Sequence, residues 1–196
     1  MSGILLIVEG GGDGKSGRTD CRRGFRLFLE RANVSPMPRI VAGGGRQQAY
    51  EKFKRVISQG QTAYLLVDSE APVEQSHRQD PWKHLKERDG WDKPHGATTD
   101  QCHLMVQLLE AWFLADPSSV ADYFGQGFNA QKLGNSPDIE VVAKPDVYER
   151  MRLATKDTRK GSYDKGRDTS EVLGRLDAGK VSGRSYFAKR FIDAFS

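Results

Sequence analysis

Residues 4–12 have the sequence ILLIVEGGG, in which five consecutive aliphatic residues precede a glutamate and three glycines. A short apolar run without polar alternation is typical of a strand that is buried on both faces of a parallel sheet. The glycines directly after it indicate a loop at the carboxyl end of this strand. The stretch therefore predicts a central strand over residues 4–8, with Glu9 at the edge of the sheet.

The residues that follow repeat this order of strand and helix. Apolar residues at helical spacing over 21–32 predict a first helix, for which Thr19 or Asp20 is the candidate cap. Residues 39–42 and 63–67 predict a second and a third strand, with a second helix between them. This alternation predicts an α/β fold with a mostly parallel, Rossmann-like sheet flanked by helices. Functional residues of such folds lie at the carboxyl ends of the strands.

A long polar segment over residues 71–100 follows the third strand. It contains one predicted short helix, with Asp80 as its cap and Pro81 as its first residue. A segment of this kind is equally typical of a substrate lid and of a plain surface loop. Trp82 and Trp91 lie in it, and we expect them to be open enough to stack on unpaired bases.

The second half of the chain is predicted to be mainly helical. Residues 102–107 predict a fourth strand and residues 108–115 an apolar helix, whose Trp112-Phe113 pair we assign to the core. Beyond it, irregular chain precedes two or three short helices. We therefore expect a core over residues 1–116 and a basic, mainly helical extension over residues 117–196 that packs on it in a single compact unit.

The net charge of +4 conceals an asymmetry along the chain. Residues 1–149 contain 18 Lys and Arg against 20 Asp and Glu, whereas residues 150–196 contain 12 against 6. A basic end after a slightly acidic body favours a polyanionic partner such as nucleic acid.

Several classes of protein are excluded by composition. The longest aliphatic run is far shorter than the roughly 20 residues of a membrane helix, so we expect no membrane association. No basic segment precedes that run, which argues against a signal peptide. Cys21 and Cys102 lack paired spacing, which argues against a disulfide framework or a zinc site and favours a cytoplasmic location.

Acidic residues follow two of the predicted strands. Glu9 is followed four residues later by Asp13, and Asp68 and Glu70 follow the third strand. Because adjacent parallel strands lie about 4.8 Å apart, these carboxylates converge if the first and third strands are neighbours. Hard divalent cations such as Mg²⁺ or Mn²⁺ would offset their repulsion. The alternative is that they are solvated residues at the ends of strands.

Residues 10–16, GGGDGKS, resemble a phosphate-binding loop of nucleotide hydrolases. The spacing does not fit, because Glu9 occupies the position of the first glycine of that motif and would repel a bound phosphate. Lys15, Arg18 and Arg22 nevertheless remain candidates for binding the phosphates of a nucleic acid.

Glu9 and the pair Asp68 and Glu70 resemble the acidic motifs of the Toprim domain, the metal-binding fold shared by topoisomerases, primases and several nucleases. Glu70 stands where that family has a second Asp. Asp13 completes a spacing similar to that of the OLD-family nucleases, and Glu110 is similar to a further acidic position there. The resemblance covers residues 1–116 and implies that these five residues bind one or two Mg²⁺ or Mn²⁺ ions.

A resemblance over nearly the whole chain is to a family of short bacterial proteins catalogued as domain of unknown function 4276. The segments that carry it are VEGG (8–11), LVDSE (66–70), MVQ (105–107), EAWFLAD (110–116) and YDKG (163–166). OLD-family nucleases also use a lysine late in the chain near the phosphate. By the resemblance to OLD-family nucleases, Lys165 is the first candidate for this lysine and Lys160 the second. The alternative is that Lys165 is an exposed surface charge.

These resemblances imply a nuclease that hydrolyses DNA or RNA phosphodiesters with Mg²⁺ or Mn²⁺, as the effector of an anti-phage defence system. Its catalytic residues would be Glu9, Asp68, Glu70 and Lys165. The alternative is a regulatory or binding subunit with silent or conditional chemistry, docked on an ABC-type ATPase. Either protein could form a homo-oligomer.

Overall fold

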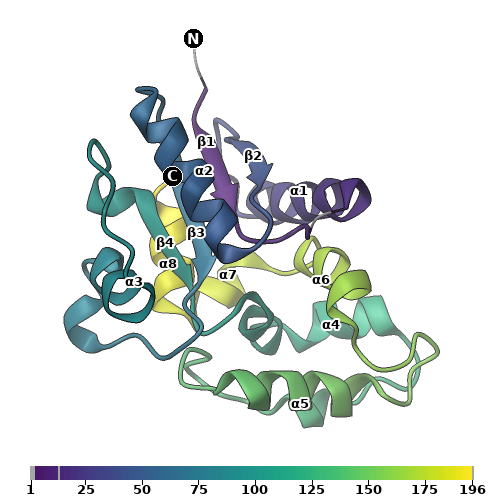
Figure 1. Cartoon of the computed structure of the whole chain (residues 1–196). Coiled ribbons are helices and arrows are strands. Elements are labelled where there is room, and N and C mark those ends of the chain that lie inside the picture. Colours follow the sequence, from purple (N-terminus) through teal and green to yellow (C-terminus); the bar gives the residue numbers. More distant parts are fainter. Residues whose placement is uncertain (1–2, 13, 196) are drawn as a thin grey trace.

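The computed structural model describes residues 3–12 and 14–195, and these form an α/β fold around a four-stranded parallel sheet (Figure 1). The strands occur in the order β2-β1-β3-β4. The Rossmann-like arrangement predicted from the alternating pattern is therefore confirmed. The strands are β1 (Leu5–Val8), β2 (Arg39–Ala42), β3 (Ala63–Asp68) and β4 (Cys102–Met105).

The first and third strands are neighbours, as the convergence of their acidic ends requires. Val8 pairs with Leu66, and the backbone N–H of Glu9 donates to the Leu66 carbonyl at 2.8 Å. Asp68 pairs with Met105 of β4. Glu9 and Asp68 therefore lie side by side at the carboxyl edge of the sheet.

Helices cover both faces of the sheet. Successive residues of each strand point to opposite faces, so both sets of side chains are buried. Leu6 and Val8 contribute to a hydrophobic cluster with α1, whereas Leu5 and Ile7 contribute to a second cluster with α2 and α3. This double burial explains the uninterrupted apolar run of β1. The three helices are α1 (Lys15–Arg31), α2 (Arg46–Ser58) and α3 (Pro81–Asp89).

The extension packs on the α1 side of the sheet and shares the larger hydrophobic cluster with it. Figure 1 shows its helices below α1 and beside β4. Within residues 3–12 and 14–195, no helix has the length and hydropathy needed to cross a membrane. The extension contains α4 (Pro117–Phe124), α5 (Lys144–Thr155), α6 (Lys165–Leu173), α7 (Ala178–Ser182) and α8 (Tyr186–Asp193).

Short 3₁₀ helices connect several of these elements. The Leu109–Ala115 segment is one of them, so the helix predicted over residues 108–115 is present as a 3₁₀ helix. Its first N–H is bonded to the Asp68 side chain, and the segment is buried on all sides, so tertiary contacts determine its backbone. The others are η1 (Gln75–His77), η2 (Thr99–Gln101) and η4 (Ala130–Leu133), and Leu109–Ala115 is η3.

The predicted start of α1 is also wrong. The helix begins at Lys15, ahead of Thr19 and Asp20, and Gly14 caps it without a side-chain hydrogen bond. Glycine is an acceptable cap, so a search for a polar cap places this start a turn too late. The fourth strand is likewise shorter than predicted, since it ends at Met105.

The prediction that Trp82 and Trp91 are open is wrong, because they are 3% and 7% exposed. The Trp82 indole donates to the Thr98 carbonyl at 3.1 Å, and Trp91 stacks on Tyr50 with ring centroids 4.5 Å apart. Trp82 also packs on Phe53 of α2, with ring centroids 5.7 Å apart, so both rings anchor the polar 71–100 segment to α2. The predicted cap of α3 is confirmed, since the Asp80 carboxylate accepts from the Trp82 N–H.

Candidate metal centre

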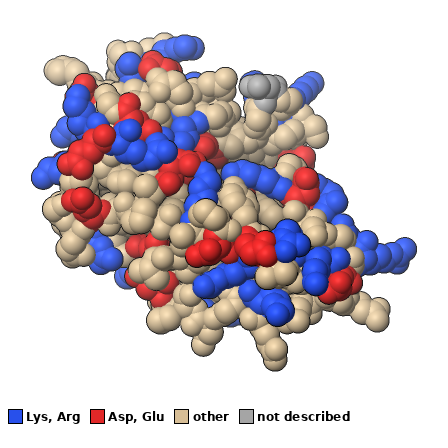
Figure 2. All heavy atoms as spheres, turned by 60° about the horizontal axis from the view of Figure 1, so that its bottom comes forward, with Lys and Arg blue, Asp and Glu red and all other residues tan. Residues whose placement is uncertain are grey.

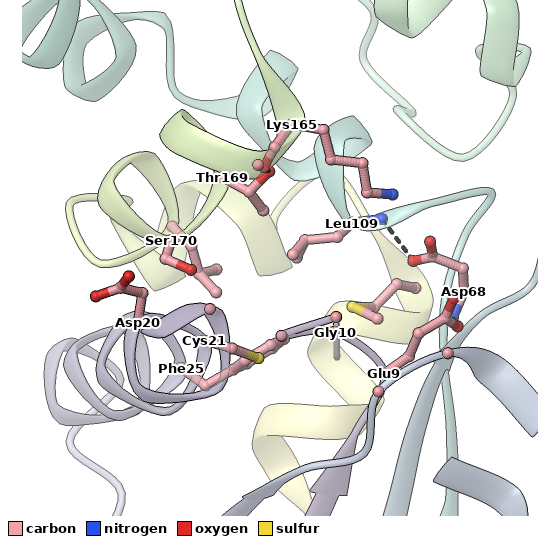
Figure 3. Close-up of a pocket in the computed structure, with 18 residues that line it drawn as sticks. Glu9, Gly10, Asp20, Cys21, Phe25, Asp68, Leu109, Lys165, Thr169 and Ser170 are labelled. Carbon is pink, nitrogen blue, oxygen red and sulfur yellow. Dashed lines mark hydrogen bonds between the residues drawn. The ribbon is translucent and has the colours of Figure 1, made fainter. Parts of the chain in front are cut away.

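Three carboxylates converge at the carboxyl edge of the sheet. Glu9, Asp68 and Glu70 each offer an oxygen atom, and these atoms lie within 4.8 Å of one another. Glu9 follows β1 directly, and Asp68 is the last residue of β3. The predicted meeting of the two acidic strand ends is thus what the fold produces, with Glu9 and Asp68 drawn in Figure 3.

Backbone donors orient two of these carboxylates. The N–H of Asp68 donates to Glu9 Oε2 at 3.0 Å. The N–H of Leu109 donates to Asp68 Oδ1 at 2.8 Å, which is the dashed line in Figure 3. Each carboxylate is therefore held by a rigid backbone group and keeps a second oxygen for another ligand.

Glu70 is held from two directions. Its φ of +62° lies in the left-handed region, which is uncommon for a residue with a side chain. Its N–H donates to the Gln107 carbonyl at 2.8 Å, and its carboxylate is bonded to the Lys144 ammonium. The N–H of Lys144 in turn donates to Gln107 Oε1 at 3.3 Å, so Gln107 supports both members of the ion pair.

Glu110 is a fourth acidic residue at this edge, and it is completely buried. Its Oε1 accepts from the Tyr163 hydroxyl at 3.0 Å and lies 3.5 Å from the Lys165 ammonium. Its Oε2 has no hydrogen-bond partner among the described residues. A buried carboxylate oxygen without a partner is unfavourable, and a bound cation would satisfy it.

The electrostatics of the site favour bound cations. Burial raises the pKa of Glu9 to about 7, although the Asp68 N–H bond and the Arg46 charge lower it. Burial also raises the pKa of Asp68 well above its usual range, and the nearby charges of Glu9 and Glu110 raise it further. These carboxyls ionise fully near neutral pH only when positive charge is added.

Besides Lys144, two further cations of the protein flank the carboxylates. Burial lowers the pKa of Lys165, but the charges of Glu110 and Asp68 outweigh it, so the net direction is upward and the ammonium stays charged. Arg46 Nε lies 3.6 Å from Glu9 Oε2 and donates to the Asp68 carbonyl at 2.9 Å. Its guanidinium is fixed by Asp89 at 2.7 and 3.0 Å.

Most of the predicted phosphate-binding residues lie apart from this centre. Arg18 Nε donates to the Gly12 carbonyl at 3.4 Å, Arg22 bonds to the Thr19 hydroxyl, and Lys15 is exposed. Lys160 lies over the Tyr123 ring, 4.6 Å from its centroid. Lys165, by contrast, lies beside the carboxylates. Asp13, the remaining predicted metal ligand, lies outside the described residues.

Sequence reasoning missed Arg46, Lys144 and Tyr163 as parts of the centre. Arg46 had a usable signal, since it begins α2 directly after a glycine turn at the same edge of the sheet. Tyr163 lies in the quoted 163–166 segment. Lys144 had no such signal in the sequence. It begins α5, which is distant from Glu70 in the chain, and nothing in the composition of α5 indicates that the two residues meet.

The acidic centre suits a hard divalent cation better than zinc. Its donors are carboxylate oxygens, which Mg²⁺ and Mn²⁺ prefer. The orphaned Glu110 oxygen is a further donor close enough to influence Asp68. The residues therefore fit the predicted ions. In the described part of the chain, one other group could hold a metal, Glu74, His77 and Glu87, and neither group contains a cysteine.

The fold and the site together define an α/β protein with a carboxylate centre at the edge of a parallel sheet. The family model described as domain of unknown function (DUF4276) matches residues 8–195, so the chain belongs to this family. Comparisons with curated proteins and with solved structures give no significant match.

Proposed function

We propose that this protein is a Toprim-like nuclease that hydrolyses phosphodiesters of DNA or RNA with Mg²⁺ or Mn²⁺. The observation that carries the proposal is the convergence of Glu9, Asp68 and Glu70 within 4.8 Å at the end of two adjacent strands. Raised pKa values at Glu9 and Asp68 support it, because the protein itself leaves this negative charge incompletely compensated.

The residues divide into two groups by role. Glu9, Asp68 and Glu70 would hold one ion, and Glu110, with Asp13 as the remaining candidate, would complete a second position. A bound ion supplies an activated water and neutralises charge on the scissile phosphate. Lys165, held in its charged form, would stabilise the negative charge that develops on the phosphate oxygens.

Isosteric substitutions at the centre test the proposal. We expect Glu9→Gln and Asp68→Asn to reduce cutting by more than about 100-fold, since even residues that only support a metal ligand contribute 10–100-fold. Cutting of supercoiled plasmid, single strands and structured RNA with Mn²⁺ is the measurement. Glu51→Gln, the same change at an exposed residue of α2, is the matched control. Undiminished activity in either active-site variant would refute the assignment.

The Glu70–Lys144 ion pair favours a second candidate function, a regulatory subunit of an ABC-type ATPase whose chemistry is conditional or lost. In this arrangement a cation of the protein already occupies the third carboxylate. Calorimetric titration with Mn²⁺ separates the candidates. A functional centre binds the ion and loses it in Asp68→Asn, whereas a vestigial one binds none.

We further propose a cytoplasmic role in defence against phage, with nucleic acid as the partner. Cys21 and Cys102 are both buried free thiols, which is typical of proteins from reducing compartments. Residues 150–196 supply the excess of basic side chains that a polyanion requires.

A further inference from the structure

A pocket of about 430 Å³ extends from the carboxylates into the space between α1 and α6. Glu9 and Asp68 lie at one end, and Asp20 and Ser170 lie at the other (Figure 3). The volume is within the roughly 300–1,000 Å³ of sites for small molecules and cofactors. A ligand whose phosphate binds at the carboxylate centre can therefore place its neighbouring group in this pocket.

The chemistry of the lining limits what that group can be. Cys21, Phe25 and Leu109 make an apolar wall, and the polar groups away from the carboxylates are few. Among the described residues that line the pocket, Lys165 is the single cation, and its ammonium points toward the Asp68 end (Figure 3). A second phosphate deeper in the pocket would meet the Asp20 carboxylate, and the cation paired with that carboxylate, Arg23 at 3.8 Å, does not line the pocket.

We propose that the pocket binds the nucleoside part of the nucleotide whose phosphate lies at the carboxylate centre, so that the substrate is an unpaired nucleotide. This proposal rests on the metal centre proposed above. A nucleobase combines an apolar face with hydrogen-bonding edges, which matches an apolar wall beside Asp20, Thr169 and Ser170. A base inside a duplex is stacked and paired, and it can enter such a pocket only after extrusion.

Two glycines in equivalent positions allow a matched test. Gly166 is the second residue of α6 after the capping Asp164, and Gly179 is the second residue of α7 after the capping Asp177. A Cβ would first meet the cap carboxylate in each case, at 3.4 and 3.1 Å. Gly166 lines the pocket and Gly179 does not. We expect Gly166→Phe to obstruct the pocket, and Gly179→Phe is the control.

Calorimetry in saturating Mn²⁺ compares inorganic phosphate, 5′-AMP, 5′-CMP, a single-stranded tetranucleotide and a blunt duplex. We expect the two nucleotides to bind at least about tenfold more tightly than phosphate, as one buried or stacked base provides. The single strand should bind more tightly than the duplex. Gly166→Phe should reduce nucleotide affinity to that of phosphate, whereas Gly179→Phe should retain the wild-type preference.

Each contrary outcome identifies what has failed. Wild-type protein that binds Mn²⁺ but prefers neither nucleotide over phosphate overturns the pocket assignment and leaves the metal centre intact. An unchanged preference in Gly166→Phe overturns it as well. Wild-type protein that binds the mononucleotides but not the tetranucleotide overturns the assignment of a nucleic-acid strand as substrate. Wild-type protein that binds no Mn²⁺ overturns the metal centre and, with it, this proposal.

Discussion

Glu9 shows at the scale of one residue how a buried carboxyl group opposes stability. Its side chain is 16% exposed, and burial raises its pKa from 4.5 to about 7. The folded state therefore binds more protons than the unfolded state between these pH values. Relative to its value below pH 4.5, the free energy of unfolding therefore falls by about 3 kcal/mol as the pH rises through 7.

Metal-free Glu9→Gln should consequently be more stable than the wild type at pH 8 by up to about 3 kcal/mol, and equally stable near pH 4.5. Glutamine keeps an oxygen that can accept the Asp68 N–H bond, so the change removes mainly the charge. Urea unfolding in a chelator at both pH values measures the difference. A stability difference of the same size at both pH values would contradict the role of Glu9 ionisation. Added Mn²⁺ should stabilise only the wild type.

At the scale of elements, the crossing of α1 and α6 holds Lys165 near the carboxylates. Gly24 of α1 faces Ser170 of α6, and a Cβ at Gly24 would lie 2.8 Å from the Ser170 carbonyl oxygen. The helices must separate to accept it. We expect Gly24→Ala to destabilise the protein by about 1–3 kcal/mol and to lower activity as Lys165 is displaced.

Gly166→Ala provides the comparison for that substitution, because its Cβ has space and alanine favours a helix. It should be neutral or stabilising by up to about 1 kcal/mol. Urea unfolding and plasmid cutting of the two variants are the measurements. Equal stability of Gly24→Ala and the wild type would show that α1 and α6 separate without strain.

At the scale of the whole molecule, the 1–116 core and the extension share a hydrophobic cluster. Trp112 stacks between Phe28 of α1 and Phe191 of α8, with ring centroids 5.1 and 6.2 Å away. We expect a 1–116 fragment to expose this face and to form no cooperative fold, seen as binding of a hydrophobic dye and a broad thermal transition. A sharp transition would show that the core is independent.

Charge is likewise a property of the whole molecule. Figure 2 shows Lys and Arg intermixed with Asp and Glu on the face that includes α5. Several basic residues of the extension are paired with acids, for example Lys180 with Asp116 and Arg167 with Asp168. The sequence excess of basic residues is therefore partly used within the protein, and Lys165 and Lys144 are directed at the acidic centre.

The sequence by itself determined the α/β class, the central strand and the acidic residues at the strand ends, whereas the pairing of β1 with β3 in the sheet brought Glu9 to Asp68. The first three follow from local patterns, since an apolar run specifies a buried strand, and the pairing acts because the carboxyl ends of adjacent parallel strands share an edge. The 3₁₀ segment at Leu109–Ala115 and the burial of Trp82 and Trp91 were decided by tertiary contacts. Only the packing of distant segments could place Lys144 on Glu70 and Tyr163 on Glu110, because no local preference records which surfaces meet.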